Sequence, residues 1–208
     1  MLLLMAAALV HPSPVPATST RGIGPVVRHR AFILLYVSWL LATTALFVPM
    51  VFLPGFARAH GVGPVAASSL VSVIGAIGIG GRVGMGALGQ HIGVVRLFRV
   101  SVAIMAGSYL LWLIAGTYPV MVAFAVTLGI GYGLRIALMP AVLIEYFGLS
   151  NLGAVLGAFF TASGLSALFG PIVAAAIVDI TGGFTGGILF ALTMGVLGFL
   201  VLLPLPRT

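Results

Sequence analysis

Six long apolar segments, separated by short polar turns, constrain the fold of this chain more than any other feature of its sequence. Backbone groups in hydrocarbon must be paired within one segment or in a closed barrel. These runs are too long and too continuously apolar for the alternating strands of a barrel, so they are predicted to be transmembrane helices. With a window of about 19 residues, they cover Ala31–Leu53, Val65–Leu88, Leu97–Ala115, Pro119–Ile144, Leu152–Val178 and Phe184–Leu203.

Composition excludes a soluble globule. Hydrophobic residues make up 62% of the 208 positions and charged residues only 5%, whereas about a quarter of the residues in a soluble domain are charged. Most of the exterior must therefore face lipid. The expected fold is an all-α membrane protein with a six-helix transmembrane domain at 31–204. Residues 1–30 are expected to form an apolar stub and a basic linker, and 205–208 a short tail.

The arginines orient the predicted helices. Positive residues are enriched in cytoplasmic loops, and placing the linker in the cytoplasm leaves only Arg58 on the opposite side. The arginines on the linker side are Arg21, Arg28, Arg30, Arg96, Arg99 and Arg207. We therefore expect a multi-pass protein of the plasma membrane with both termini in the cytoplasm. The net charge of +7 is not gathered on one basic face, which argues against nucleic-acid binding.

The first ten residues, Met1 to Val10, are apolar but short. At 1.5 Å per residue they cross only about half of a 30 Å hydrocarbon core. A signal peptide is one interpretation, although the positively charged start is missing. The favoured interpretation is the tail of a spanning helix that belongs to an earlier part of the fold.

Small residues recur at every fourth position in four of the segments, which allows helix backbones to approach closely in lipid. Pro49, Pro140 and Pro171 each remove a backbone donor inside a predicted helix, whereas Pro119 falls at a helix start that tolerates it. The stripes are Ala76-Gly80-Gly84, Gly129-Gly133-Ala137-Ala141, Ala158-Ala162-Ser166-Gly170 and Gly183-Gly187-Ala191-Gly195.

No enzyme motif accompanies these helices. The sequence lacks GxSxG, phosphate-loop and HExxH patterns, and its histidines are scattered. The only two acids, Glu145 and Asp179, are predicted at opposite membrane faces, too far apart for acid–base partnership. We therefore expect no catalytic residues, no cofactor and no metal site.

The segment from Gly81 to Gly93, GRVGMGALGQHIG, resembles the GRxxxGxxxDRxG signature of the major facilitator superfamily. In that family the motif caps a helix at the cytoplasmic face, where charged residues latch neighbouring helices. Gln90 replaces the acid of the signature and His91 its second basic residue, which puts the charged latch in doubt. The residues that match in register are Gly81, Arg82, Gly86 and Gly93.

Two later stretches resemble the same family. The segment 145–157 is similar to the connection between its tenth and eleventh helices, and 170–184 to the eleventh-to-twelfth junction. The resemblance implies the C-terminal half of a twelve-helix transporter and is strongest to the monocarboxylate porters and the oxalate/formate antiporters. Such transporters consist of two six-helix halves with nested inverted repeats.

Arg135 is the arginine predicted deepest within a span. A charge at such depth costs at least a few kcal/mol and marks a functional site by default. One interpretation is a guanidinium that binds a substrate carboxylate bidentately; the other is an arginine that snorkels or pairs with another helix. Tyr132 and Met139 are expected on its face by i, i+3 and i+4 spacing.

Further cavity candidates lie on two other spans. The resemblance implies that the first span lines the central cavity, where the candidates are Tyr36, Trp39 and Thr43, although Tyr and Trp near membrane ends also serve as interfacial anchors. Thr161 and Ser163 are expected to contact substrate or to bond their own backbone.

The resulting hypothesis is a secondary transporter that moves a small solute, such as a monocarboxylate or other organic anion, by alternating access. The alternatives are a truncated half or remnant that is inactive alone, and a subunit that pairs with a second six-helix half or with itself.

Overall fold

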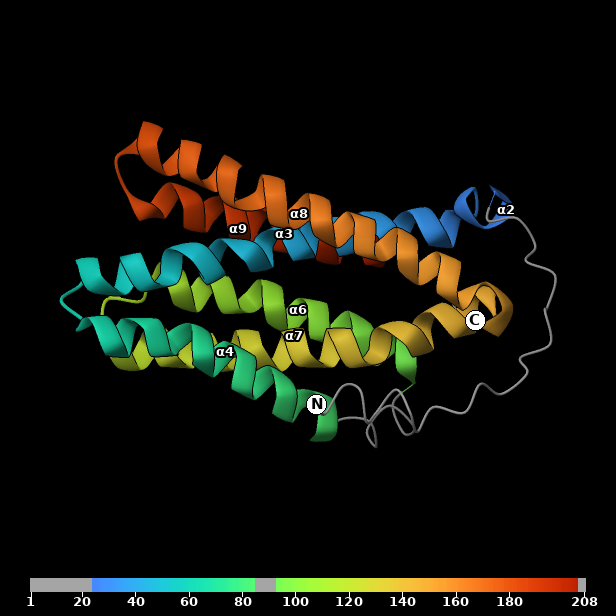
Figure 1. Ribbon diagram of the computed structural model, residues 1–208, viewed down its shortest axis with the longest axis horizontal. Coiled ribbons are helices and arrows are strands. Elements are labelled where there is room, and N and C mark those ends of the chain that lie inside the picture. Colours follow the sequence, from blue (N-terminus) through green and yellow to red (C-terminus); the bar gives the residue numbers. More distant parts are fainter. Residues whose placement is uncertain (1–23, 85–92, 206–208) are drawn as a thin grey trace, which may run out of the picture.

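The computed structural model describes residues 24–84 and 93–205, and it confirms the six-helix bundle (Figure 1). Six of the described helices are long and apolar enough to cross a membrane. They are α3 (Arg30–Ala59), α4 (Pro64–Gly84), α6 (Val94–Leu113), α7 (Tyr118–Phe147), α8 (Leu152–Thr181) and α9 (Phe184–Leu202). A short helix α2 (Gly24–Val27) precedes them, and a 3-10 turn, η1 (Leu149–Asn151), links α7 to α8. The apolar stub at 1–10 lies outside the described residues.

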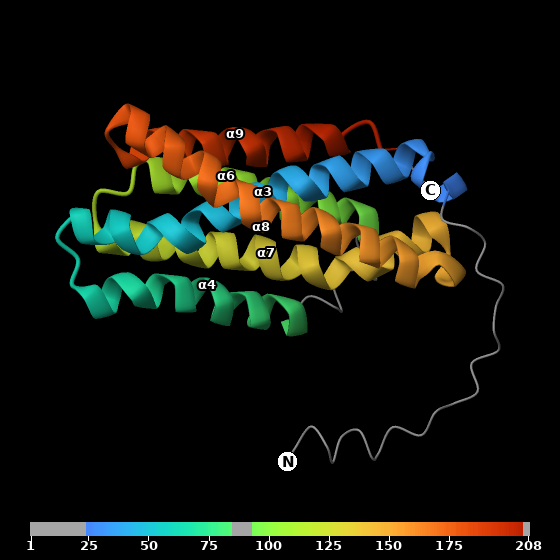
Figure 2. The ribbon, with the colours of Figure 1, turned by 45° about the horizontal axis from the view of Figure 1, so that its top comes forward.

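The helices form two interleaved groups of three. Helix α7 packs along α4 and α6, whereas α3 packs along α8 and α9, and α6 and α9 pack against each other. Figure 1 shows α3, α8 and α9 on one side of the bundle and α4, α6 and α7 on the other, and Figure 2 shows α4 at the edge of the bundle, next to α7. When the chain is divided into α3–α4–α6 and α7–α8–α9, the first helix of each half packs with the last two helices of the other half. This exchange is the pattern expected from two structural repeats.

Helices α3, α7 and α8 each contain 30 residues. At 1.5 Å per residue they are about 45 Å long, well beyond a hydrocarbon core of about 30 Å. Each has proline in its interior: Pro49 and Pro54 in α3, Pro140 in α7 and Pro171 in α8. Every such proline frees a carbonyl one turn earlier, so these three helices have local weak points in their backbone hydrogen bonding.

Glycine brings helices of the two repeats into close contact. A Cβ atom on Gly129 would lie 2.9 Å from the carbonyl oxygen of Ile74, and one on Gly133 would collide with the backbone of Gly78. The α8 stripe packs on α3, because a Cβ on Gly170 would lie 3.1 Å from the carbonyl oxygen of Thr44. Lipid provides no hydrophobic drive between helices, so such close packing holds the bundle together.

The α4 stripe at Ala76 and Gly80 does not make such a contact within the chain. Both residues are exposed, and nothing lies within 4 Å of a Cβ on Gly80. Gly78 and Gly81 contact α7 instead. Within the described chain the residues at 76 and 80 therefore make no close helix contact, because α4 is rotated so that Gly78 and Gly81 face α7.

Gly133→Ala should destabilise the bundle, because its methyl group would overlap the α4 backbone at Gly78. Overpacking of this kind costs about 1–3 kcal/mol, so the apparent Tm of the chain in mild detergent should fall by roughly 2–4 °C for each kcal/mol. The matched control is Gly107→Ala on α6, which is exposed and has no atom within 4 Å of the added Cβ. Equal Tm values for the two variants would contradict the close α4–α7 contact.

Candidate functional site

Arg135 lies in the interior of the bundle, between α7 and α3. Its side chain is 1% exposed. The Nη2 group donates to the backbone carbonyl of Trp39 over 2.9 Å and to the hydroxyl oxygen of Thr43 over 2.7 Å. The central guanidinium carbon is 3.9 Å from the centroid of the Trp39 ring, which is the geometry of a cation–π contact. Three interactions with α3 therefore hold this guanidinium.

Neither acidic side chain of the described residues lies against Arg135. The sequence contains only two acids, Glu145 and Asp179, and both are exposed. Glu145 is on the same helix but about 15 Å further along it, at 1.5 Å per residue. The described acceptors of Arg135 are a carbonyl and a hydroxyl, both neutral. A buried charge held only by neutral groups remains available to an anion from outside the chain.

Trp39 joins three helices at this point. Its indole Nε1 donates to the hydroxyl of Ser163 on α8 over 2.8 Å, while its ring receives Arg135 from α7. Phe159 of α8 packs edge-on against it, with ring centroids 5.8 Å apart. The orientation of this indole is therefore set from α7 and α8 together.

One turn further along α8, Ser166 makes further polar contacts with α3. The Ser166 hydroxyl donates to the carbonyl of Leu40 over 2.9 Å, and the Thr44 hydroxyl lies 3.1 Å from Ser166. Three hydrogen bonds thus join α3 and α8, from Trp39, Leu40 and Thr44.

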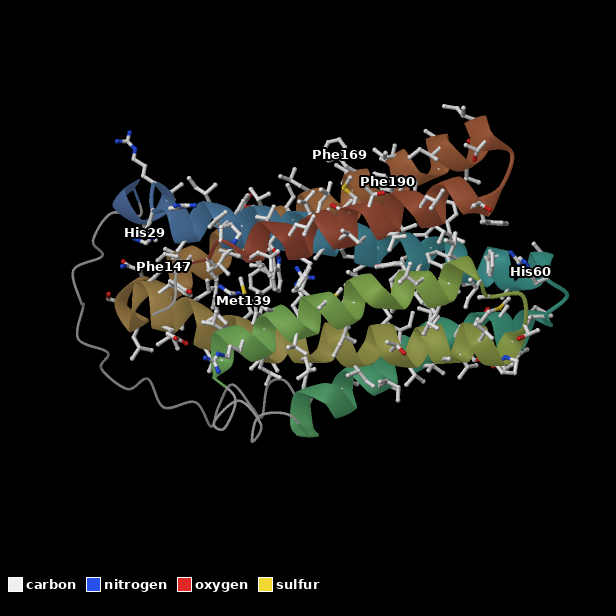
Figure 3. All side chains as sticks on the ribbon, turned by 180° about the vertical axis from the view of Figure 1, so that it is seen from behind. His29, His60, Met139, Phe147, Phe169 and Phe190 are labelled. Carbon is white, nitrogen blue, oxygen red and sulfur yellow. The ribbon has the colours of Figure 1, made fainter. Side chains whose placement is uncertain are left out.

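A cavity of about 220 Å³ lies beside Trp39, between α3, α7 and α8. Pockets for drug-sized ligands are roughly 300–1,000 Å³, so this cavity suits a smaller solute. Figure 3 labels Met139 in the interior of the bundle, with His29 and Phe147 at one end and His60 at the other. The cavity is lined by Trp39, Ile136, Met139, Pro140, Leu156, Phe159 and Phe160.

The candidates chosen from the sequence fall into separate places. Arg135, Trp39 and Thr43 are brought together. Tyr36 lies in an aromatic cluster one turn before Trp39, stacked on Phe32 at 5.6 Å. Thr161 is exposed and donates to its own helix at the carbonyl of Ala158 over 2.6 Å.

Tyr132 faces α4 rather than α3. The guanidinium carbon of Arg82 is 5.5 Å from the centroid of its ring, and a Cβ on Gly78 would lie 3.2 Å from the same ring. The shared face expected for Tyr132, Arg135 and Met139 is thus divided: the tyrosine contacts α4, the arginine contacts α3, and the methionine lines the cavity.

The described part of the glycine-rich motif lies where α4 ends and α6 begins. Gly81 faces α7, with a Cβ 3.5 Å from the carbonyl oxygen of Ile130. Gly93 precedes α6 with a φ of 89°, a conformation that favours glycine. Gly86, Gln90 and His91 lie outside the described residues. Among the residues that the structure describes, no group of His, Asp or Glu could hold a metal ion.

Sequence patterns gave no indication of the contacts made by Phe159 and Thr44 at this site. Ser166 belonged to the α8 small-residue stripe and lies three residues after Ser163, so the two hydroxyls share one helix face. The spacing of these two serines is the one sequence feature that could have predicted a polar contact on this face of α8.

Comparison with known proteins establishes the class to which this bundle belongs. The family model of the Major Facilitator Superfamily matches residues 35–208. The chain therefore belongs to the major facilitator superfamily, a family of membrane transporters, and this membership confirms the expectation that it is not an enzyme.

The relatives identify the branch. Monocarboxylate transporter 3 of Mus musculus is 32% identical over 160 residues, which cover 74% of this chain and 32% of the relative. Monocarboxylate transporter 12 of Mus musculus is 29% identical over 184 residues, or 83% of this chain and 37% of the relative. The chain spans about a third of the length of these relatives, and its similarity confirms the expected monocarboxylate-transporter-like branch.

A solved structure has the same fold. The crystal structure of the human organic anion transporter MFSD10 (TETRAN) superposes with a TM-score of 0.68 at 19% sequence identity. The match covers 85% of this chain and 47% of that transporter. The six helices therefore correspond in fold to about half of a major facilitator protein.

Tryptophan fluorescence should report the Arg135–Trp39 stack. The chain has two tryptophans, so Trp112→Phe leaves Trp39 as the only emitter. In that background Arg135→Gln should shift the emission maximum, because the cation 3.9 Å from the ring acts on the excited indole through its electric field. Arg58→Gln, which changes an exposed arginine, is the matched control. An identical spectrum with and without Arg135 would contradict the stack.

Proposed function

We propose that this chain forms one six-helix half of a secondary transporter that moves a small organic anion, of the monocarboxylate class, by alternating access. The observation that supports the proposal is the buried guanidinium of Arg135, whose described acceptors are both neutral and which stacks on Trp39. Trp39 in turn lines a small cavity. The names of the relatives, monocarboxylate transporters and an organic anion transporter, support an anionic solute.

A carboxylate that enters the cavity would compete for Arg135. Charge-assisted, bidentate bonds to a carboxylate are stronger than bonds to a carbonyl and a hydroxyl. The solute would therefore displace the Trp39 carbonyl and the Thr43 hydroxyl as partners of Nη2. Since these two bonds hold α7 to α3, binding would loosen the contact between the two repeats. The solute would then bind more tightly to a helix arrangement without these two bonds than to the arrangement in which they are made. A transport cycle requires such a difference in affinity between two conformations.

A second six-helix half is the proposed partner. The chain covers about a third of its relatives' length, and two helices that correspond between the repeats, α4 and α8, keep exposed glycines. No atom lies within 4 Å of a Cβ on Gly75 or Gly80 of α4, or on Gly153, Gly157 or Gly164 of α8. Such surfaces suit close packing against further helices in a bilayer. A half that is inactive until it is paired is the alternative.

The proposed topology has both chain ends in the cytoplasm of the plasma membrane. It rests on the arginine bias toward one side, with Arg58 at the opposite end of the bundle near His60.

Uptake into liposomes tests the transport proposal. The assembly that contains this chain, purified in mild detergent and reconstituted, should take up radiolabelled L-lactate with saturation. Arg135→Gln should raise the KM by roughly 10-fold or more, since hydrogen bonds to a charged group contribute about 1.5–3 kcal/mol. Arg58→Gln, at an exposed position remote from Arg135, should leave the KM unchanged.

The probes distinguish the parts of this proposal. Uptake of oxalate but not lactate would restrict the class to dicarboxylates. Absence of uptake for lactate, pyruvate and oxalate would contradict transport by the assembly. Unchanged kinetics for Arg135→Gln would remove Arg135 from the solute site.

Single cysteines test the topology, because the chain has no cysteine of its own. Thr117→Cys, in the exposed α6–α7 connection, should react with a membrane-impermeant maleimide on intact cells. Ser150→Cys, in the exposed α7–α8 connection, should react only after the membrane is opened. The reverse labelling pattern would invert the proposed orientation.

A further inference from the structure

A second cavity lies at the end of the bundle where α3 ends and α9 begins. It has a volume of about 340 Å³ and shares no lining residue with the cavity beside Trp39. Its wall is formed by the end of α3, the segment that follows α6 and the first two turns of α9. Figure 3 labels His60 at this end of the bundle, opposite to His29 and Phe147. An apolar cavity of about 150 Å³ is large enough to bind benzene, so this one has room for a substituted aromatic ring.

Aromatic side chains of α3 and α9 meet at the wall of this cavity. The rings of Phe56 and Phe184 lie edge-on, with centroids 5.8 Å apart and an interplanar angle of 89°, and the His60 ring lies tilted against Phe56 at 4.2 Å. Such rings offer faces and edges to a further aromatic ring. Among the described residues that line the cavity there is no arginine and no acid. Because an ion without a countercharge is costly to place against an apolar wall, the cavity suits a neutral aromatic ligand.

The imidazole of His60 gives the cavity a hydrogen-bond acceptor. Its Nδ1 lies 2.9 Å from the carbonyl oxygen of Phe56. A carbonyl oxygen only accepts, so Nδ1 carries the hydrogen, and Nε2 of the neutral ring is left as an acceptor. Nε2 has no hydrogen-bond partner among the described residues. Another part of the wall follows the end of α6 at Leu113, and the last carbonyl groups of a helix have no partner within that helix. Both features favour a ligand that donates a hydrogen bond.

We propose that this cavity binds a small neutral aromatic alcohol of the phenol type. The hydroxyl of the ligand donates to Nε2 of His60, and the ring of the ligand packs against Phe56 and Phe184. Because α3 and α9 belong to different repeats, the ligand links the two repeats at this end of the bundle. The proposed topology places this end outside the cell, so the ligand arrives from the extracellular side. The site is separate from Arg135 and does not rest on the proposed transport of an anion.

Fluorescence quenching by a brominated probe tests the site. The ring of Trp112 lies 6.0 Å from that of Phe56, whereas Trp39 is about 25 Å from Phe56 along α3, at 1.5 Å per residue. In the purified chain in lipid nanodiscs, 4-bromophenol should therefore quench the tryptophan emission with saturation, and Trp112→Phe should remove the saturable part. In 4-bromoanisole a methyl group replaces the donor hydrogen. This probe should bind about 3- to 10-fold more weakly, the size expected for one lost hydrogen bond.

Histidine variants assign the hydrogen bond. His60→Phe keeps an aromatic ring and should weaken the binding of 4-bromophenol about 3- to 10-fold, while the affinity for 4-bromoanisole stays unchanged. The matched control is His29→Phe, at the exposed opposite end of the bundle, which should bind both probes as the wild type does.

Three results would overturn the proposal. Equal affinity of the wild type for the two probes, or an equal loss for both in His60→Phe, would exclude the bond to His60. Tighter binding of 4-bromobenzoate than of 4-bromophenol would exclude a neutral ligand. Quenching that rises without saturation would show partition into the lipid in place of binding to the cavity.

Discussion

The positive charge of Arg135 lies inside a bundle whose other buried side chains, among the described residues, are uncharged, and the surrounding helices provide the groups that hold it. A cation in the membrane interior is tolerated when it is paired or fully hydrogen-bonded. Here the partners come from α3, as a carbonyl, a hydroxyl and an aromatic ring. The indole that receives the cation is itself bonded to α8 through Ser163. The first helix of each repeat is thereby joined to the other at the level of the cavity.

This junction depends on glycines elsewhere in the bundle. Gly129 and Gly133 bring α7 against α4, and Gly131 brings it against α6. With three glycines within little more than one turn, α7 packs closely on both neighbours, and its remaining face carries Arg135 toward α3. Apolar side chains at those positions would push α7 outward, because protein interiors do not accommodate added volume without strain. The position of the charge is therefore a consequence of backbone packing as much as of its own hydrogen bonds.

The candidate site could be predicted only in part. Depth within a span identified Arg135, and the resemblance of the first span to a cavity helix identified Trp39 and Thr43. Tyr132 was placed on the same face as Arg135, but at 3.6 residues per turn the two positions are about 60° apart. That angle, together with long side chains, directs Tyr132 to Arg82 and α4 while Arg135 reaches α3. Helical spacing therefore predicts the direction in which a side chain leaves its helix. Which helix that side chain contacts depends on how the neighbouring helices are placed.

The sequence by itself determined that the chain contains six segments long and apolar enough to span a membrane, and that it resembles the major facilitator superfamily. Both follow from properties of single segments: apolar length decides insertion because each helix pairs its own backbone groups, and the motifs are local. The tertiary structure alone decided which glycines pack, with Gly78 and Gly81 in place of Gly80 on α4. It also decided that Arg135 bonds α3 and stacks on Trp39. These outcomes depend on the rotation and depth of helices far apart in sequence, which a pattern within one segment does not encode.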